Sequence, residues 1–146
     1  MLTLLIIAIV VLDQMTKFAV VSNMNLGSSI PIVQDFFHLT YILNAGAAFG
    51  ILENSRYFFV GTAIIVLLGL IFFRKFIASE PFSVRIGIAL FAGGTLGNLI
   101  DRIRLGMVID FFDFRIWPIF NIADIAICVG VGLIIWSTLL TEMKTK

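Results

Sequence analysis

Residues 84–103 read VRIGIALFAGGTLGNLIDRI, and this stretch combines the two features that decide the fold. It is long and apolar enough for a membrane-spanning helix, which needs about 20 mostly apolar residues. Its second half also carries glycines and polar side chains, although charge inside a bilayer is costly. The stretch therefore predicts a membrane helix that packs closely against a neighbour and holds functional groups.

Three further stretches have a similar length and character, so we predict an all-α membrane protein with four transmembrane helices. The predicted helices cover residues 2–21, 57–73, 84–103 and 119–140. Of the 146 residues, 60% are hydrophobic and 13% are charged. A soluble domain of this size could not bury so much apolar surface. We expect residues 1–146 to form a single integral membrane domain.

Residues 22–56 separate the first two predicted helices and should form a small strand-rich platform on the membrane surface. Within them, residues 37–43 (FHLTYIL) show the alternation of a half-buried strand, and Gly27 and Pro31 supply turn residues. Short connections at 74–83 and 104–118 should join the later helices. Four spans place both termini on one side of the membrane and the platform on the other.

Basic residues predict the orientation, because they are enriched on the cytoplasmic side. The side with the termini carries five, namely Arg74, Lys75, Arg85, Lys144 and Lys146. The opposite side carries four, namely Arg56, Arg102, Arg104 and Arg115. We therefore expect cytoplasmic termini. The net charge of +1 provides no basic field for nucleic acid, so no nucleic-acid partner is expected.

Asn98, Asp101 and Arg102 lie at spacings i, i+3 and i+4 and so share one face of the third predicted helix. The glycines before them would let another backbone approach closely. One interpretation is a packing motif with an internal ion pair between Asp101 and Arg102. That interpretation leaves Asn98 without a role, so a functional cluster is favoured.

Two more polar clusters follow, in residues 108–114 (VIDFFDF) and 118–124 (PIFNIAD). We interpret Asp113 as a solvated loop carboxylate, and Asp124 alone could merely benefit from a helix N-terminus. However, Asp110 and Asp124 fall at the same membrane surface and are joined by a short loop. Two carboxyls that meet there would share a proton, so that one can activate water while the other protonates a leaving amine.

Asp13 and Lys17, at i and i+4 in the first predicted helix, form the fourth polar pair. They could be an ion pair with Lys17 reaching toward the lipid head groups, or they could bind substrate. Their charges, and the lack of a basic start, argue that this helix is retained and is not a cleaved signal peptide. Residues 44–50 (NAGAAFG) are small enough to let a peptide approach.

Taken in order, these motifs resemble those of the lipoprotein signal peptidases, also called type II signal peptidases. The motifs are Asp13 with Lys17, Asn44-x-Gly-x-Ala-Phe49, Gly97-Asn-x-x-Asp-Arg102, Val108-x-Asp-Phe111 and Phe120-Asn-x-Ala-Asp124. The resemblance implies a four-helix aspartic endopeptidase of the bacterial inner membrane with a strand-rich periplasmic cradle. Such enzymes cut diacylglyceryl-modified prolipoproteins before the lipidated cysteine and need no metal or organic cofactor. The connection from Asp110 to Asp124 looks a few residues shorter than in that family.

Position by position, the resemblance assigns the catalytic roles to Asp110 and Asp124. Asn98, Arg102, Asn44 and Asn121 match residues of the substrate cleft, and Asp13 and Lys17 match the paired residues of the first helix. The implied partners are prolipoproteins, membrane lipid and a globomycin-type inhibitor in the cleft. The expected protein is a monomer whose active site lies on the periplasmic or outer face.

Several alternatives remain open at this point. A small transporter or ion channel could use the carboxylates as an ion path. A metal-dependent hydrolase could use Asp101, Asp110 and Asp124 as oxygen ligands. A serine–lysine peptidase would need Ser22 beside Lys17. The single cysteine, Cys128, is interpreted as a packing residue.

Overall fold

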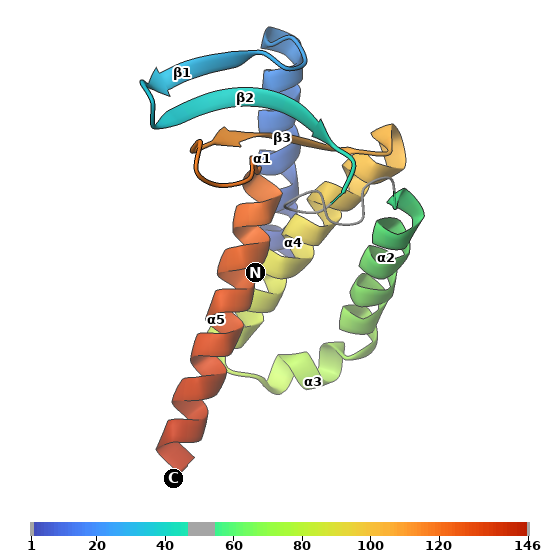
Figure 1. Ribbon diagram of the computed structural model, residues 1–146. Helices are drawn as coiled ribbons and strands as arrows, with labels where there is room; N and C mark the ends of the chain where they lie inside the picture. The colour runs from blue at the N-terminus through green and yellow to red at the C-terminus, as the bar shows by residue number, and fades with distance from the viewer. Residues whose placement is uncertain (1, 47–54, 146) are drawn as a thin grey trace.

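A computed structural model describes residues 2–46 and 55–145 of the chain, as five helices and three strands (Figure 1). In chain order these are α1 (Leu2–Asn23), β1 (Ser29–Val33), β2 (Phe37–Asn44), α2 (Arg56–Phe72), α3 (Arg74–Ser79), α4 (Phe82–Leu105), β3 (Val108–Asp113) and α5 (Ile122–Thr145). The helices form a bundle, and the sheet lies across one end of it. The predicted residues Ala48 and Phe49 lie outside the described ranges.

Three of the described helices are long and apolar enough to cross a bilayer: α1, α4 and residues 122–141 of α5. The prediction of a mostly helical membrane protein is therefore confirmed. The fourth predicted span corresponds to α2, which is apolar but has only 17 residues. At 1.5 Å per residue it is about 25 Å long, at the lower limit for crossing the bilayer core.

Two predicted boundaries were wrong. The connection at 74–83, expected to be a turn, contains the short helix α3. Helix α5 begins at Ile122, three residues later than expected, because Phe120 still pairs with Phe112 beside the sheet. The last turn of α4 ends at Gly106, whose positive φ of 81° is a conformation that glycine adopts at little cost.

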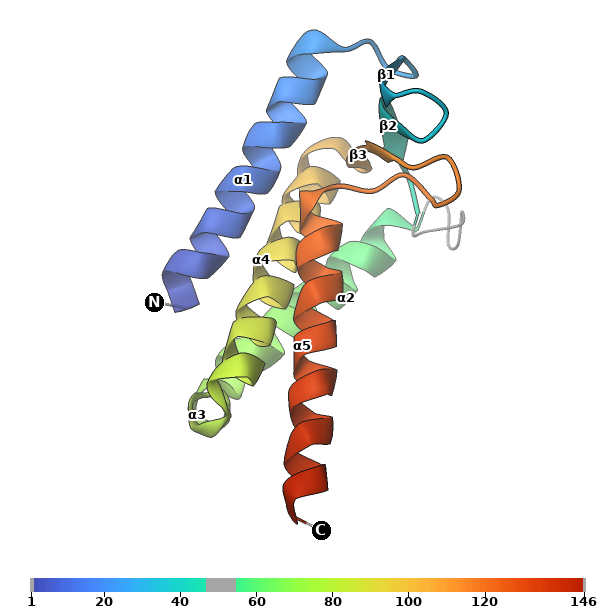
Figure 2. The ribbon, with the colours of Figure 1, turned by 90° about the vertical axis from the view of Figure 1, so that its left-hand side faces the viewer.

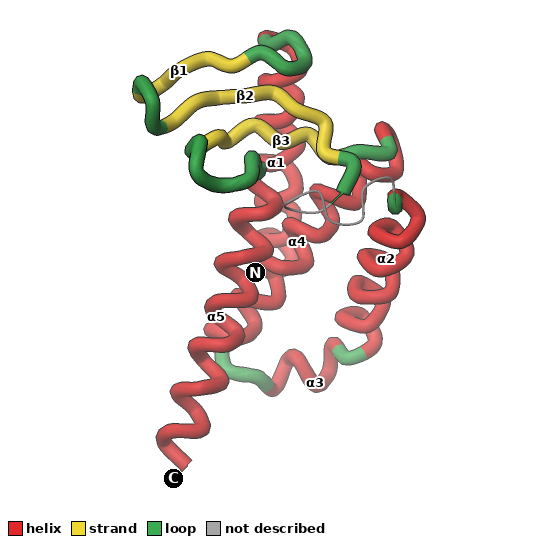
Figure 3. Tube along the Cα trace, in the orientation of Figure 1, coloured by secondary structure: helices red, strands yellow, loops and turns green. Residues whose placement is uncertain are grey.

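The predicted strand-rich platform is confirmed, but its third strand comes from elsewhere in the chain. Strands β1 and β2 form an antiparallel pair, and β3, from the loop between α4 and α5, adds to the other edge of β2 (Figure 3). Apolar side chains of the sheet pack against the end of α1 in a small core of Val20, Tyr41, Ile109 and Phe111. This core fixes β3, and with it Asp110, above the helices.

Asp113 was wrongly interpreted as a solvated carboxylate. It ends β3 and is only 4% exposed. It accepts hydrogen bonds from Thr40 Oγ1 at 2.7 Å and from the Arg115 backbone N–H at 2.8 Å. Although burial opposes its ionisation, these hydrogen bonds hold the pKa of Asp113 below its usual value. Its role is to tie the turn after β3 to the sheet.

Helix α4 is the central helix and contacts α1, α2 and α5 (Figure 2). Glycines allow this close packing. A Cβ added at Gly94 would overlap the Ala123 carbonyl oxygen of α5, and one at Gly93 would lie 2.9 Å from Ile9 Cβ of α1. The predicted function of the glycine-rich stretch in helix packing is thus confirmed.

Candidate active site

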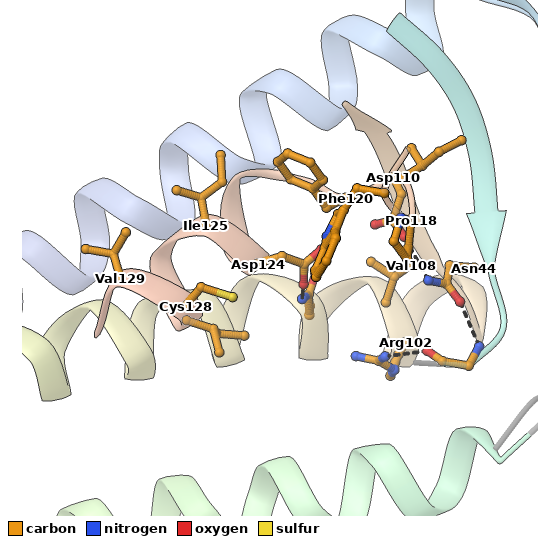
Figure 4. A pocket seen from close by; sticks show the side chains of 15 residues that line it. Asn44, Arg102, Val108, Asp110, Pro118, Phe120, Asp124, Ile125, Cys128 and Val129 are labelled. Carbon is orange, nitrogen blue, oxygen red and sulfur yellow. Dashed lines mark hydrogen bonds between the residues drawn. The ribbon is translucent and has the colours of Figure 1, made fainter. Parts of the chain in front are cut away.

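A pocket of about 540 Å³ opens where β3, the loop 114–121 and the first turns of α5 meet α4 (Figure 4). Its polar lining is formed by Asn44, Asn98, Arg102, Asp110 and Asp124. Its other end is apolar and follows α5 through Ile125, Ile127 and Val129. The pocket therefore joins a polar chamber to an apolar groove along a membrane helix.

Asp110 reaches this chamber from the middle of β3, where it is paired with Ile42 of β2. It is 1% exposed. Its Oδ1 accepts a hydrogen bond from Asn121 Nδ2 at 2.7 Å, and its Oδ2 accepts one from Asn44 Nδ2 at 2.9 Å. Asn44 is itself held, since its amide oxygen accepts the Gly46 N–H at 2.9 Å.

Asp124 enters the chamber from the first turn of α5 and is fixed by a reciprocal capping box. The Asn121 side-chain oxygen accepts the Asp124 N–H at 2.9 Å, and Asp124 Oδ2 accepts the Asn121 N–H at 3.2 Å. Asp124 Oδ1 accepts a further hydrogen bond from Asn98 Nδ2 at 2.8 Å. The helix start and the site thus share one carboxylate, and all four oxygens of the two aspartates are hydrogen-bonded.

Lys17 decides which way the Asn98 amide points. Its ammonium lies 3.0 Å from Asn98 Oδ1, and an ammonium can only donate hydrogen bonds. Asn98 must therefore turn its oxygen toward Lys17 and its NH₂ group toward Asp124. Asn121 Nδ2, 3.1 Å away, donates to the same Asn98 oxygen. One buried cation thereby sets the hydrogen-bond direction at the site.

Lys17 is itself buried between two carboxylates, with 1% of its surface exposed. Its Nζ lies 2.9 Å from Asp13 Oδ2 and 2.8 Å from Asp101 Oδ2. Gln14, which sequence reasoning missed, donates to Asp101 Oδ1 at 2.9 Å. The predicted ion pair of Asp13 and Lys17 is thus present, but the idea that Lys17 reaches toward the head groups was wrong. The sequence did contain a signal for Gln14, because it is a polar residue directly after Asp13 in an otherwise apolar helix.

Asp13 also connects α1 to α5. Its Oδ1 accepts the backbone N–H of Ala123 at 3.0 Å, which satisfies one of the free donors at the start of that helix. Neither Asp13 nor Lys17 lines the pocket of the two aspartates, although Lys17 borders a smaller cavity of about 190 Å³. The pair supports the site from behind.

Arg102 does not pair with Asp101, so the alternative interpretation of an internal ion pair was wrong. Its Nη2 donates to the Gly46 carbonyl oxygen at 3.1 Å, just after β2. Its guanidinium also lies 4.6 Å from the centre of the Phe59 ring on α2. Arg102 therefore links the rim of the pocket to both the platform and α2.

The electrostatics of the chamber favour the protonated form of Asp110. Burial, and then the negative charge of Asp124, raise the pKa of Asp110 from 3.8 to about 7. Hydrogen bonds from Asn44 and Asn121 and the charge of Lys17 act in the opposite direction. At neutral pH the carboxyl of Asp110 is therefore about half protonated, so it can either donate or accept a proton.

The structure gives no support to two of the alternative sites. Among the described residues, no three side chains of His, Cys, Asp or Glu are arranged to hold a metal ion, and Asp101 points at Gln14 and Lys17. Ser22 is exposed whereas Lys17 is buried in its ion pairs, so the serine–lysine arrangement was wrong.

Cys128 was also misread as a packing residue. It is exposed and lines the pocket, about one turn beyond Asp124 on α5 (Figure 4). A thiol at this position can report on what occupies the apolar half of the pocket.

Comparisons with known proteins agree with this geometry. The family model described as signal peptidase (SPase) II matches residues 5–140. Lipoprotein signal peptidases of Pelotomaculum thermopropionicum and Moorella thermoacetica are 49% and 43% identical to this chain, over 97% and 94% of it and 94% and 91% of their own lengths. A bacterial membrane enzyme solved at 2.3 Å by the in meso method has a TM-score of 0.91 and 38% identity, over 99% of this chain and 90% of its own.

The sequence resemblance is thus confirmed over nearly the whole chain, and the transporter alternative gains no support. Residues of four of the motifs that carried the resemblance line one pocket, Asp13 and Lys17 lie behind it, and the family match covers all five motifs. The chain therefore belongs to the signal peptidase II family, the lipoprotein signal peptidases, and is a peptidase that removes signal peptides from prolipoproteins.

Proposed function

We propose that Asp110 and Asp124 are the catalytic dyad of this peptidase. The observation that carries the proposal is the pair itself. Asp110, which is buried, and Asp124, which is half-buried, line one pocket, and burial and Asp124 raise the pKa of Asp110 to about 7. The ionised carboxylate takes a proton from a water molecule, which attacks the scissile carbonyl carbon. The protonated carboxyl then donates its proton to the departing nitrogen.

The substrate fits the two halves of the pocket. We propose that a diacylglyceryl-modified prolipoprotein places its scissile bond, just before the lipidated cysteine, in the polar chamber. Asn44 and Arg102 lie at the rim and would hold the peptide backbone, while Asn98 and Asn121 hold the dyad. The apolar side chains of α5 would receive the signal helix or the lipid chains.

Asp13 and Lys17 are proposed to act on substrate indirectly. Both are buried and contact Asn98, Asp101 and Ala123. Their position supports a role in which Lys17 sets the direction of the Asn98 amide and Asp13 anchors the start of α5. Direct contact with substrate stays a prediction.

The proposed arrangement in the membrane makes α2 the fourth span. Its apolar composition supports this arrangement. So does its exposure, because none of its apolar side chains is buried within the protein and lipid would cover them. The termini would be cytoplasmic and the pocket would lie at the outer face of the bacterial inner membrane. We further propose a monomer, one domain over residues 1–146, and a globomycin-type inhibitor that binds in the pocket.

The test is processing of a purified diacylated prolipoprotein by Asp110→Asn and Asp124→Asn. Both variants should lose cleavage by about three orders of magnitude or more, since each removes a group that transfers a proton in the transition state. Asp113→Asn is the matched control, because it alters a buried aspartate on the same strand that faces Thr40 and Arg115. It should retain cleavage in any preparation that remains folded.

Labelling of Cys128 by a maleimide separates binding from catalysis. Substrate or globomycin should protect this thiol in the wild type and in Asp110→Asn alike, because Cys128 lines the pocket and Asp110→Asn leaves the lining of α5 unchanged. Near-wild-type cleavage by either dyad variant would reject the catalytic assignment. If a dyad variant loses both cleavage and the protection of Cys128 by substrate, the substitution has collapsed the pocket.

A further inference from the structure

A second cavity, of about 530 Å³, lies beside α3, which connects α2 to α4. Figure 1 shows α3 at the end of the bundle away from the sheet. Its walls come from α1, α2, α3 and α4. They are mostly aliphatic, as in Leu2, Ile6, Leu67, Leu70, Ile77 and Ile88. None of these residues belongs to the pocket of the dyad.

The cavity exists because α1 and α2 both pack on α4 and leave space between them. Its floor on α4 includes Ala89 and Ala92, whose methyl side chains fill little volume. Helix α2 has no buried residue of its own. A cavity of this size and apolar lining suits a small hydrophobic ligand or part of a larger one.

Two arginines, Arg74 on α3 and Arg85 on α4, line the same cavity. Among the described side chains, no carboxylate lies within ion-pair distance of either guanidinium. The Arg85 Nε atom is buried and has no hydrogen-bond partner in the described part of the chain. Within the described ranges, its guanidinium contacts the ring of Phe82, whose centre lies 5.7 Å away. This end of the cavity therefore offers hydrogen-bond donors and positive charge that no carboxylate of the described residues neutralises.

We propose that this cavity binds an anionic phospholipid, with the phosphate held between Arg74 and Arg85 and an acyl chain lying along Ala89 and Ala92. Guanidinium groups bind phosphate oxygens in a forked, charge-assisted geometry. Basic pockets between membrane helices are sites of this chemistry. The apolar walls favour a lipid over a free phosphate ion, because a free phosphate has no acyl chain to pack against them.

Charge also decides against other occupants. The start of a substrate signal peptide is positively charged, so two arginines would repel it. A zwitterionic lipid carries an ammonium beside its phosphate, which would weaken its binding between the arginines. A bound anionic lipid would fill the space between α1 and α2, and would add contacts to α2, which packs mainly on α4. The site thus has a role in holding the bundle together that does not depend on proteolysis.

The test is native mass spectrometry of the full-length protein in detergent, titrated with dioleoyl phosphatidylglycerol or with dioleoyl phosphatidylcholine. The wild type should retain one molecule of the anionic lipid at concentrations where the zwitterionic lipid is lost. Arg74→Gln and Arg85→Gln should each weaken retention by about tenfold, the effect of removing one charge-assisted contact worth roughly 1.4 kcal/mol.

Lys75→Gln is the matched control, since it removes one positive charge from the neighbouring position of α3 but does not line the cavity. It should leave retention unchanged. Equal retention of the two lipids, or equal weakening by Lys75→Gln, would overturn the proposal. So would binding of glycerol 3-phosphate as tight as that of the anionic lipid, because it would show a free-phosphate site without a place for acyl chains.

Discussion

Replacing Gly94 by alanine should disable the enzyme without altering either carboxyl of the proposed dyad. A Cβ added at Gly94 would overlap the Ala123 carbonyl oxygen and would lie 2.8 Å from Ile127 Cγ1. Ordinary contact between carbon atoms needs about 3.5–4.0 Å, so α5 must move away from α4 by about 1 Å at this point. Because Ala123 precedes Asp124, the Asp124 carboxylate of the proposed dyad moves with it.

The expected magnitude follows from that displacement. A misplacement of about 1 Å in a reacting group costs on the order of 100-fold in rate. Overpacking of this kind destabilises a fold by about 1–3 kcal/mol, offset by up to about 1 kcal/mol from the better helix propensity of alanine. Gly94→Ala should therefore remain folded in detergent while it processes a diacylated prolipoprotein about 100 times more slowly.

Gly132→Ala provides the control, since Gly132 lies within α5, the neighbouring helix, and a Cβ there would meet nothing within 4 Å. It should cleave at the wild-type rate. The assay measures kcat/KM for the lipidated precursor together with the thermal unfolding temperature of each variant. If Gly94→Ala cleaves as fast as Gly132→Ala, the close contact of α4 and α5 does not position the dyad, and the link from helix packing to catalysis is refuted.

Two further outcomes follow from the buried charges. Lys17→Met leaves Asp13 and Asp101 without their cation and should lower the free energy of unfolding by about 3–5 kcal/mol. Denaturant unfolding in detergent measures this loss, and an unchanged free energy of unfolding would contradict the prediction. The pKa of Asp110 is about 7 in the folded state and 3.8 for an ordinary aspartate, so between these pH values the folded state keeps a proton that the unfolded chain has lost. This proton contributes stability that is largest at low pH and disappears as pH rises from about 4 to 7. Asp110→Asn should remove that slope from thermal unfolding curves, and wild-type kcat/KM should fall above pH 7, where Asp110 loses its proton; a slope retained in the variant would contradict the assignment.

The sequence by itself determined the membrane-embedded helices, the platform and the two aspartates. Apolar runs long enough to cross a bilayer are visible in any single chain, because length and composition alone decide whether a helix is stable in lipid. Polar residues within such runs are equally visible, because their cost demands a reason. Their shared membrane surface then linked Asp110 to Asp124, although 13 residues lie between them, and the resemblance assigned them the catalytic roles.

Only the tertiary structure decided how those residues work together. The joining of β3 to β2 places Asn44 against Asp110, and that pairing depends on contacts between segments more than 60 residues apart. Burial of Asp113 follows from the same pairing, which no local pattern of the loop contains. The two ion pairs of Lys17, and hence the direction of the Asn98 amide, exist because glycines let α1, α4 and α5 come close enough to exclude water. Sequence shows which groups are costly in lipid, but the partners that compensate them come from distant parts of the chain and are fixed only when the helices pack.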